Sequence, residues 1–277
     1  MYVLDMSTGE RVRAWRPAVP QVSEVLHARF VGHSYPAHTH AEWTLLLVDS
    51  GEVAYRLDRH DLRTGGALVT LLPPGVPHDG QSAQPSVGFQ KRVAYLTEDW
   101  LGAGAVGRAV DRPAIQRADV LEGVRRLHAA LATPGEELAA ESLVHRTAEL
   151  VRAHLGSTPL DTGPRADRGL ARRFREVLDA DPIAPPTLVA AGALLGVHPS
   201  SLSRVFARAY GLPPHRYVTG RRVDLARHLL LDGASPADAA ALAGFSDQAH
   251  LTRHFRRTLG VTPAAFARSG AHRGLVA

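Results

Sequence analysis

Leu202-Ser-Arg-Val-Phe-Ala-Arg-Ala-Tyr-Gly211 and Leu251-Thr-Arg-His-Phe-Arg-Arg-Thr-Leu-Gly260 are two copies of one pattern, offset by 49 residues. Leucine, arginine, phenylalanine, arginine and glycine recur at the same five places in both copies. A proline follows each glycine by three residues, and an aromatic residue follows each proline by three more. Chance does not produce so many coincidences, so the pattern indicates a duplicated structural unit.

Each copy has the spacing of an amphipathic helix. Its leucine and phenylalanine are four residues apart and therefore lie on one buried stripe, while its two arginines project from the other side. The glycine at the end of each copy predicts a left-handed helix cap.

A second, shorter helix is expected before each copy. Apolar residues fill 188–195 and 237–243, each is followed by a glycine turn, and Ser200 and Ser246 stand where a capping residue is needed. A helix, a tight turn and a second helix with polar residues at its start make a helix-turn-helix unit. The segment 217–231 then joins the two units as one helix.

The stretch Gly244-Phe-Ser-Asp-Gln-Ala-His-Leu-Thr-Arg-His-Phe-Arg-Arg-Thr-Leu-Gly-Val-Thr-Pro263 resembles the hallmark of the AraC/XylS family of bacterial transcription regulators. That family joins two helix-turn-helix units by one connecting helix and ends the second unit in Gly-x-x-Pro. The resemblance covers roughly residues 167–268. It implies an all-α DNA-binding domain and a promoter as its partner.

Recognition helices read base edges from their N-terminal turns, which selects the candidate DNA-binding residues. In the first unit these are Ser200, Ser201, Ser203 and Arg204. In the second unit they are Gln248, Ala249, His250, Thr252 and Arg253. Glutamine suits adenine and arginine suits guanine in bidentate geometry. The repeated arginines can instead be surface residues or ion-pair partners; we favour DNA contact for Arg204 and Arg253.

The distribution of charge supports the same interpretation. Residues 165–277 hold 16 arginines against 8 acidic residues, whereas residues 1–164 hold 16 basic against 19 acidic residues. A basic C-terminal part on a slightly acidic body is typical of a domain that meets a polyanion. We expect the fragment 165–277 to fold and bind DNA by itself.

The periodicity divides the rest of the chain. Short apolar runs separated by turn residues over 22–100 predict strands of a sandwich or small barrel. We expect a two-domain α+β protein: a cupin-like β-barrel at 1–118, a helical pair at 119–155, a linker at 156–166 and an all-α double helix-turn-helix domain at 167–277. The helical pair either covers its own sheet or pairs with another subunit, and dimerisation is our preferred interpretation.

Histidines are concentrated in the predicted barrel. His38 and His40 are two residues apart, which puts them on one face of a strand, and His78 follows a Pro-Gly turn that can bring it to them. The arrangement resembles the two motifs of cupin barrels. AraC-family regulators commonly carry a cupin-like effector domain at this position.

Three roles remain open for this cluster. Metal-binding cupins place a glutamate four or five residues after the second histidine, where this chain has Thr44 and Leu45, although Glu42 lies on the same face. Three imidazoles suffice for zinc or iron, so His38, His40 and His78 can be a divalent-metal site. We favour an effector pocket that includes Thr44; internal hydrogen bonding is the third role.

Two functions from different classes follow. The first is a transcription regulator whose barrel binds a small-molecule effector and whose C-terminal domain binds double-stranded promoter DNA. The second is a metal-dependent cupin enzyme fused to a DNA-binding module; the missing glutamate disfavours it, and we expect no enzyme and no certain cofactor. We expect a homodimer, allow a contact with RNA polymerase, and expect no membrane partner and a cytoplasmic location. With no cysteine, the chain has no disulfide or thiolate-held metal.

Overall fold

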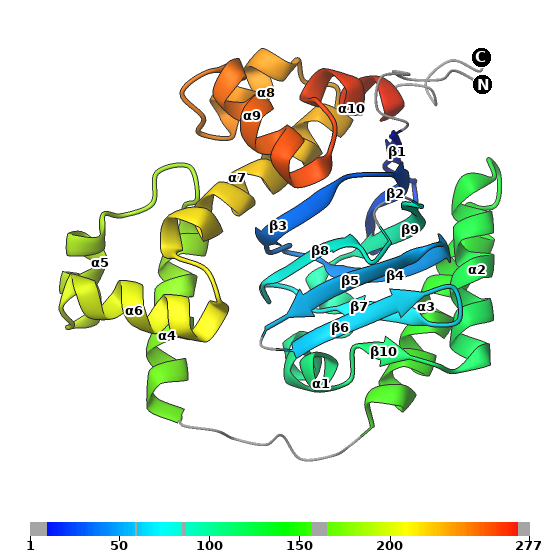
Figure 1. The fold of residues 1–277 in the computed structure, drawn as a ribbon, viewed down its shortest axis with the longest axis horizontal. Helices are drawn as coiled ribbons and strands as arrows, with labels where there is room; N and C mark the ends of the chain where they lie inside the picture. Colours follow the sequence, from blue (N-terminus) through cyan, green and yellow to red (C-terminus); the bar gives the residue numbers. More distant parts are fainter. Residues whose placement is uncertain (1–9, 59, 85–86, 157–164, 271–277) are drawn as a thin grey trace.

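The computed structural model describes residues 10–58, 60–84, 87–156 and 165–270 (Figure 1). Antiparallel strands form two sheets in the N-terminal domain, with the order β1-β2-β9-β4-β7-β10 in the larger and β3-β8-β5-β6 in the smaller. The strands are β1 (Arg11–Trp15), β2 (Val22–Phe30), β3 (Ser34–His38), β4 (Trp43–Ser50), β5 (Glu52–Leu57), β6 (His60–Gly65), β7 (Val69–Leu72), β8 (His78–Ser82), β9 (Phe89–Leu96) and β10 (Ala114–Ile115). The predicted strand-rich body at 22–100 is therefore present.

The sequence of β4 explains the layers of this domain. Side chains alternate between the two faces of a strand, so Leu46 and Val48 lie in the core between the sheets, whereas Leu45 and Leu47 lie in a second core outside the larger sheet. Because both faces are covered, β4 is apolar without alternation.

Helices cover the outer face of the larger sheet. They are α1 (Val106–Asp111), α2 (Ala118–Ala132) and α3 (Glu137–Leu155), after short 3₁₀ turns at Glu98–Trp100 and Ala103–Ala105. The stripe of α2 that begins with Val120 and Val124 is fully buried in the same core as β4. Of the two roles left open for this helical pair, its apolar stripes serve the first, covering the chain's own sheet.

The C-terminal domain is helical. It contains α4 (Arg165–Ala180), α5 (Leu188–Leu195), α6 (Pro199–Tyr210), α7 (Pro214–Leu231), α8 (Pro236–Leu242), α9 (Gln248–Leu259) and α10 (Pro263–Gly270). The linker predicted at 156–166 falls mainly on 157–164, outside the described residues. No helix within the described ranges is both long and apolar enough to cross a membrane.

The helix ends test the predicted caps. Gly211 and Gly260 adopt left-handed conformations with φ of 67° and 79°, as expected. The predicted N-caps were wrong: Ser200 lies inside α6, whose cap is His198 because Pro199 takes the first helical position. In the second unit Asp247, not Ser246, is the N-cap, and its carboxylate accepts a hydrogen bond of 2.6 Å from the backbone N–H of His250.

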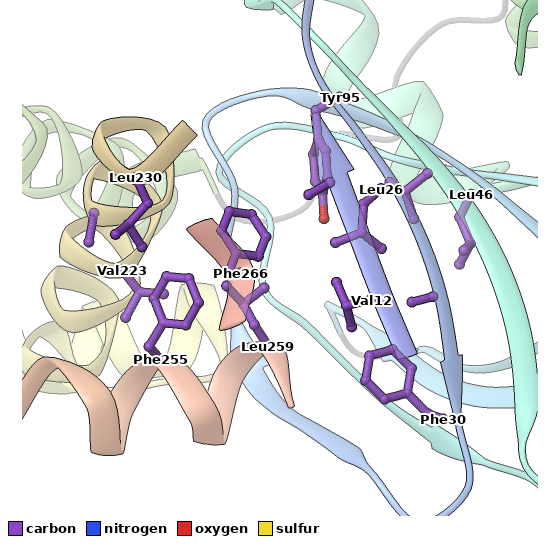
Figure 2. Close-up of a cluster of buried hydrophobic side chains, with 14 of the residues drawn as sticks. Val12, Leu26, Phe30, Leu46, Tyr95, Val223, Leu230, Phe255, Leu259 and Phe266 are labelled. Carbon is purple, nitrogen blue, oxygen red and sulfur yellow. The ribbon is translucent and has the colours of Figure 1, made fainter. Parts of the chain in front are cut away.

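The two helix-turn-helix units have different cores. The first unit buries Phe174, Leu202, Phe206 and Tyr217 in a core of its own. The second unit shares one continuous core with the inside of the β-domain, as Figure 2 shows. This shared core joins residues of α7, α9 and α10 to residues of β1, β2, β4 and β9: Val223, Leu230, Phe255, Leu259 and Phe266 on one side, and Val12, Leu26, Phe30, Leu46 and Tyr95 on the other.

Candidate functional site

The predicted DNA-binding residues of the first unit lie on the first turns of α6. Ser200 and Arg204 are exposed, and Ser201 and Ser203 are half-buried. Leu202 and Phe206 hold the opposite face of the helix in the core. The polar side of α6 is thus available at the surface.

Helix α9 presents a broader surface. Gln248, Ala249, Thr252 and Arg253 line one shallow concave patch, which Arg256 and Arg257 extend towards the end of the helix. Sequence reasoning did not select Arg256. The Thr252 hydroxyl donates to the carbonyl oxygen of Gln248 at 2.8 Å, and this bond holds it against the helix.

His250 is the predicted residue that the patch does not include. Its Nδ1 lies 3.0 Å from Ser246 Oγ, and its ring packs edge-on to Phe245 at a centroid distance of 5.3 Å. His250 therefore supports the turn before α9 while its neighbours face outward.

Arg204 and Arg253 have the environment that phosphate or base contact requires. Both side chains are exposed, and neither has an ion-pair partner among the residues that the structure describes. Internal pairing, the alternative role for these arginines, is therefore not what the structure presents. With Arg256 and Arg257, Arg253 makes the outer face of α9 strongly positive.

The predicted histidine cluster is assembled inside the β-domain. His38 ends β3, His78 begins β8 and pairs with His38 across the ladder, and His40 lies just beyond β3. The ring centroids are 4.5 Å apart for His38 and His78, 4.8 Å for His38 and His40, and 4.9 Å for His40 and His78. One potential ligand atom from each ring lies within 4.8 Å of the others.

All three imidazoles are buried, with at most 7% of each residue exposed. Burial lowers the pKa of His78 to about 4. Burial, together with the neighbouring imidazoles, holds the pKa of His38 and of His40 well below the usual range. The rings are therefore neutral at physiological pH, the state in which imidazole binds metals.

The two other predicted members of the site lie nearby in different environments. Thr44 is buried on the face of β4 that carries Leu46, and its hydroxyl has no hydrogen-bond partner within the described part of the chain. Glu42 is also buried, but its carboxylate lies 2.9 Å from Nε2 of His228 on α7. The Glu42 carboxylate therefore has its partner in the C-terminal domain.

A buried ionic cluster connects this site to α7. The guanidinium of Arg227, which is fully buried, lies 2.7 Å from Glu24, 3.5 Å from Asp224 and 3.9 Å from Glu42. The same guanidinium lies 4.3 Å from the ring centroid of Tyr95. Asp224 in turn lies 3.4 Å from Nδ1 of His40.

Comparison with known proteins identifies the two parts of the chain separately. A model of the AraC-like ligand binding domain matches residues 20–148, and a model of a helix-turn-helix domain matches residues 192–269. The chain belongs to the AraC family.

Curated relatives of this AraC-family chain are transcription regulators. It is 37% identical over 70 residues to the virulence regulon transcriptional activator VirF of Yersinia enterocolitica, which covers 25% of the chain and 26% of VirF. It is 32% identical over 114 residues to the regulator RipA of Corynebacterium glutamicum, which covers 41% of the chain and 34% of RipA. The chain thus spans only about a quarter to a third of the length of these relatives.

Solved structures extend the likeness in fold to the whole chain. ToxT from Vibrio cholerae, in a crystal structure described as bound to an unsaturated fatty acid, superposes with a TM-score of 0.59. The alignment covers all of both chains at 10% identity, so the similarity concerns the fold.

Sequence reasoning about this AraC-family chain missed the contribution of α7 to the effector domain. The sequence places Asp224 and Arg227 only within the connecting helix predicted at 217–231. The signal that was available is their spacing: two charged residues three apart stand on the apolar face defined by Val223 and Leu230. Charged residues there need buried partners, but the sequence does not say which.

Proposed function

We propose that this chain is a transcription regulator that binds promoter DNA through α6 and α9 and responds to an effector bound in its N-terminal domain. The base-reading residues are those predicted at the starts of the two helices. The observation that carries the proposal is the duplicated helix-turn-helix, which leaves Arg204 and Arg253 exposed at equivalent positions without ion-pair partners among the described residues.

The effector half of the proposal rests on the position of the histidine cluster. His38, His40, His78 and Thr44 offer buried polar atoms beside the apolar core that lies between the two sheets. A few convergent polar groups in apolar surroundings are typical of a ligand site. The related fold of ToxT, described as bound to a fatty acid, supports the idea that this kind of domain holds small molecules.

Further parts of the proposal follow from its logic. Promoter binding implies a cytoplasmic location, and a contact with RNA polymerase would connect binding to transcription. A homodimer through 119–155 would use the outer faces of α2 and α3, since their apolar stripes cover the chain's own sheet. We assign no catalytic step to the chain, in keeping with relatives that are regulators.

The experiment is a comparison of specific and random DNA. Binding sites selected from genomic fragments by the purified full chain are used to measure Kd for the parent protein, Arg204→Ala and Arg253→Ala. Loss of a bidentate base contact is expected to weaken specific binding by about 1–3 kcal/mol and to relax one base position per variant. Arg29→Ala, which removes an exposed arginine from β2, is the matched control and is expected to leave Kd unchanged.

Two results would contradict the proposal. If no genomic fragment is selected over random DNA, the chain is not a sequence-specific regulator. If both variants weaken specific and random DNA equally, the arginines contact phosphate and the assignment of base-reading residues is wrong.

A further inference from the structure

The three buried histidines are oriented by their hydrogen bonds. Nδ1 of His38 lies 2.8 Å from the carbonyl oxygen of Pro36, and Nδ1 of His78 lies 3.0 Å from that of Val76. A carbonyl oxygen only accepts, so each Nδ1 carries the proton and donates it. Nε2 is therefore the unprotonated nitrogen of both rings.

The third ring has the same pattern with a different partner. Nδ1 of His40 lies 3.4 Å from a carboxylate oxygen of Asp224, which also accepts. Its Nε2 is likewise left as the free nitrogen. Across the residues that the structure describes, no side chain or carbonyl bonds Nε2 of any of the three rings.

We propose that His38, His40 and His78 form a binding site for a divalent transition-metal ion, with Zn²⁺ as the reference case, and that Asp224 links its occupancy to the position of α7. The inference rests on the proposed function in one respect, because it identifies the metal as an effector of that regulator. The metal site itself stands on the geometry of the three side chains.

The arrangement matches known requirements for zinc. Three neutral imidazoles with one open position are an established ligand set, with Zn–N distances of about 2.0–2.1 Å. Tetrahedral geometry at that distance separates the nitrogens by about 3.3 Å. The potential ligand atoms lie within 4.8 Å of one another, so small rotations of the rings bring them to the metal.

The outer contacts are those that metal-binding histidines make. Ligating histidines usually donate the second ring N–H to a backbone carbonyl or a carboxylate, which fixes the ring and raises its basicity. Here two rings have carbonyls and one has a carboxylate. The carboxylate comes from the DNA-binding half of the chain, 184 residues away from the histidine that it contacts.

The cluster lies beside a network of buried carboxylates and basic side chains. Glu24, Glu42 and Asp224 lie together around the guanidinium of Arg227; His228 also contacts Glu42, and Arg221 lies 3.9 Å from Asp224. Lys91 is a further basic group in this domain; its ammonium lies 4.0 Å from the ring centroid of Tyr35, and burial lowers its pKa to about 7. Asp224 contacts both His40 and this network, which connects the histidine cluster to α7.

The first test measures the metal directly. Untagged full chain is stripped with a chelator and titrated with Zn²⁺ against a competing indicator, and Co²⁺ binding is followed by its visible absorption. We expect one ion per chain and a Co²⁺ spectrum of tetrahedral intensity. His38→Ala and His78→Ala are expected to bind at least 100-fold more weakly, whereas His60→Ala, which removes an exposed histidine from β6, should match the parent.

The role of Asp224 needs a separate readout, since it positions a ligand and does not bind the metal. Asp224→Asn is expected to weaken Zn²⁺ binding about 10–100-fold while the shape of the Co²⁺ spectrum is kept. In the parent, Zn²⁺ should also slow hydrogen exchange of the α7 amides, and this slowing should be smaller in the variant.

The outcomes separate this inference from the proposed function. Absence of stoichiometric Zn²⁺ binding, or equal binding by the parent and His38→Ala, would overturn it. Should the alanine variants fail to fold, pulsed electron paramagnetic resonance of the Cu²⁺-loaded parent counts the coordinating imidazoles, and fewer than two would refute it. Promoter binding is measured on the same samples: if DNA binding persists without any metal site, only this inference fails, and if metal binds but DNA does not, only the regulator assignment fails.

Discussion

Replacing Arg227 by methionine tests how the two domains are held together. The methionine keeps much of the volume of the arginine stem but removes a fully buried guanidinium that lies against Glu24, Asp224 and Glu42. Three carboxylates then remain buried without their common cation. We expect the domains to separate before either of them unfolds.

The expected magnitude follows from these contacts. Removing one partner of a buried ion pair costs about 3–5 kcal/mol, because the other charge stays buried and uncompensated. Burial, with the nearby carboxylates of Glu42 and Asp224, already raises the pKa of Glu24 to about 7 against the opposing influence of Arg227. In the variant the Glu24 carboxylate can become neutral by taking up a proton, which is easier at low pH. The loss of unfolding free energy should therefore be larger at pH 8 than at pH 6.

The assay combines two local probes. All three tryptophans lie in the N-terminal domain, so urea unfolding followed by fluorescence reports on that domain. Hydrogen exchange of the α7 amides reports on docking of the C-terminal domain. Arg216→Met, at an exposed position on the same helix, is the control and should change stability by less than about 0.5 kcal/mol.

A double-mutant cycle with Glu24→Gln decides whether the ion pair is responsible. The double variant is expected to lose less unfolding free energy than the two single variants lose in sum, by at least about 1 kcal/mol. The reason is that a neutral side chain at position 24 no longer requires the guanidinium as a partner. Additive losses, or an Arg227→Met variant within about 1 kcal/mol of the parent with unchanged exchange of α7, would refute the reasoning.

Three other predictions concern separate parts of the chain. Gly192→Ala should be at least about 1 kcal/mol less stable than Gly169→Ala, because a Cβ at 192 would lie 2.7 Å from a carbonyl oxygen whereas a Cβ at 169 meets nothing within 4 Å; equal unfolding midpoints would contradict this. Burial lowers the pKa of His27 to about 4 and that of its neighbour His128 well below 6.5, so both rings stay neutral in the folded state and stability falls as pH drops below 6.5. The melting temperature of His128→Leu relative to that of the parent should therefore rise as the pH is lowered from 7 to 5. Melting temperatures that change with pH in parallel would exclude the effect. The fragment 165–277 should footprint two DNA segments about one helical turn apart, because α7 is about 27 Å long at 1.5 Å per residue, but it should melt lower than in the full chain; protection of a single half-site would mean that one unit does not reach DNA.

The sequence by itself determined the helix-turn-helix domain in considerable detail. Leu202, Phe206, Leu251 and Phe255 are buried as their spacing predicts, and the glycines that follow adopt the left-handed conformation. These features depend on contacts within a few turns of one helix, so short-range periodicity is enough to reveal them. The cap residues were predicted wrongly because Asp247 and His198 compete with nearby serines for the same local role.

The histidine cluster could be predicted only in part. Spacing of two residues placed His38 and His40 together, and a Pro-Gly turn suggested His78, all of which the structure brings together. The sequence could not show that Glu42 contacts His228, or that Asp224 is the carboxylate that lies beside His40. Those partners lie about 180 residues apart in the sequence, and no local sequence pattern indicates a contact over such a separation.

The docking of the domains was decided by tertiary structure alone. A charge split and a turn-rich segment predicted an autonomous DNA-binding half, yet the second unit shares its core with the β-domain and buries Arg227 there. An amphipathic pattern shows which face of a helix is apolar but not what covers it. For α2 and α3 the covering surface is the chain's own sheet, which packs apolar side chains against them. For α7 it is the β-domain, which also supplies Glu24 and Glu42 as buried partners of Arg227.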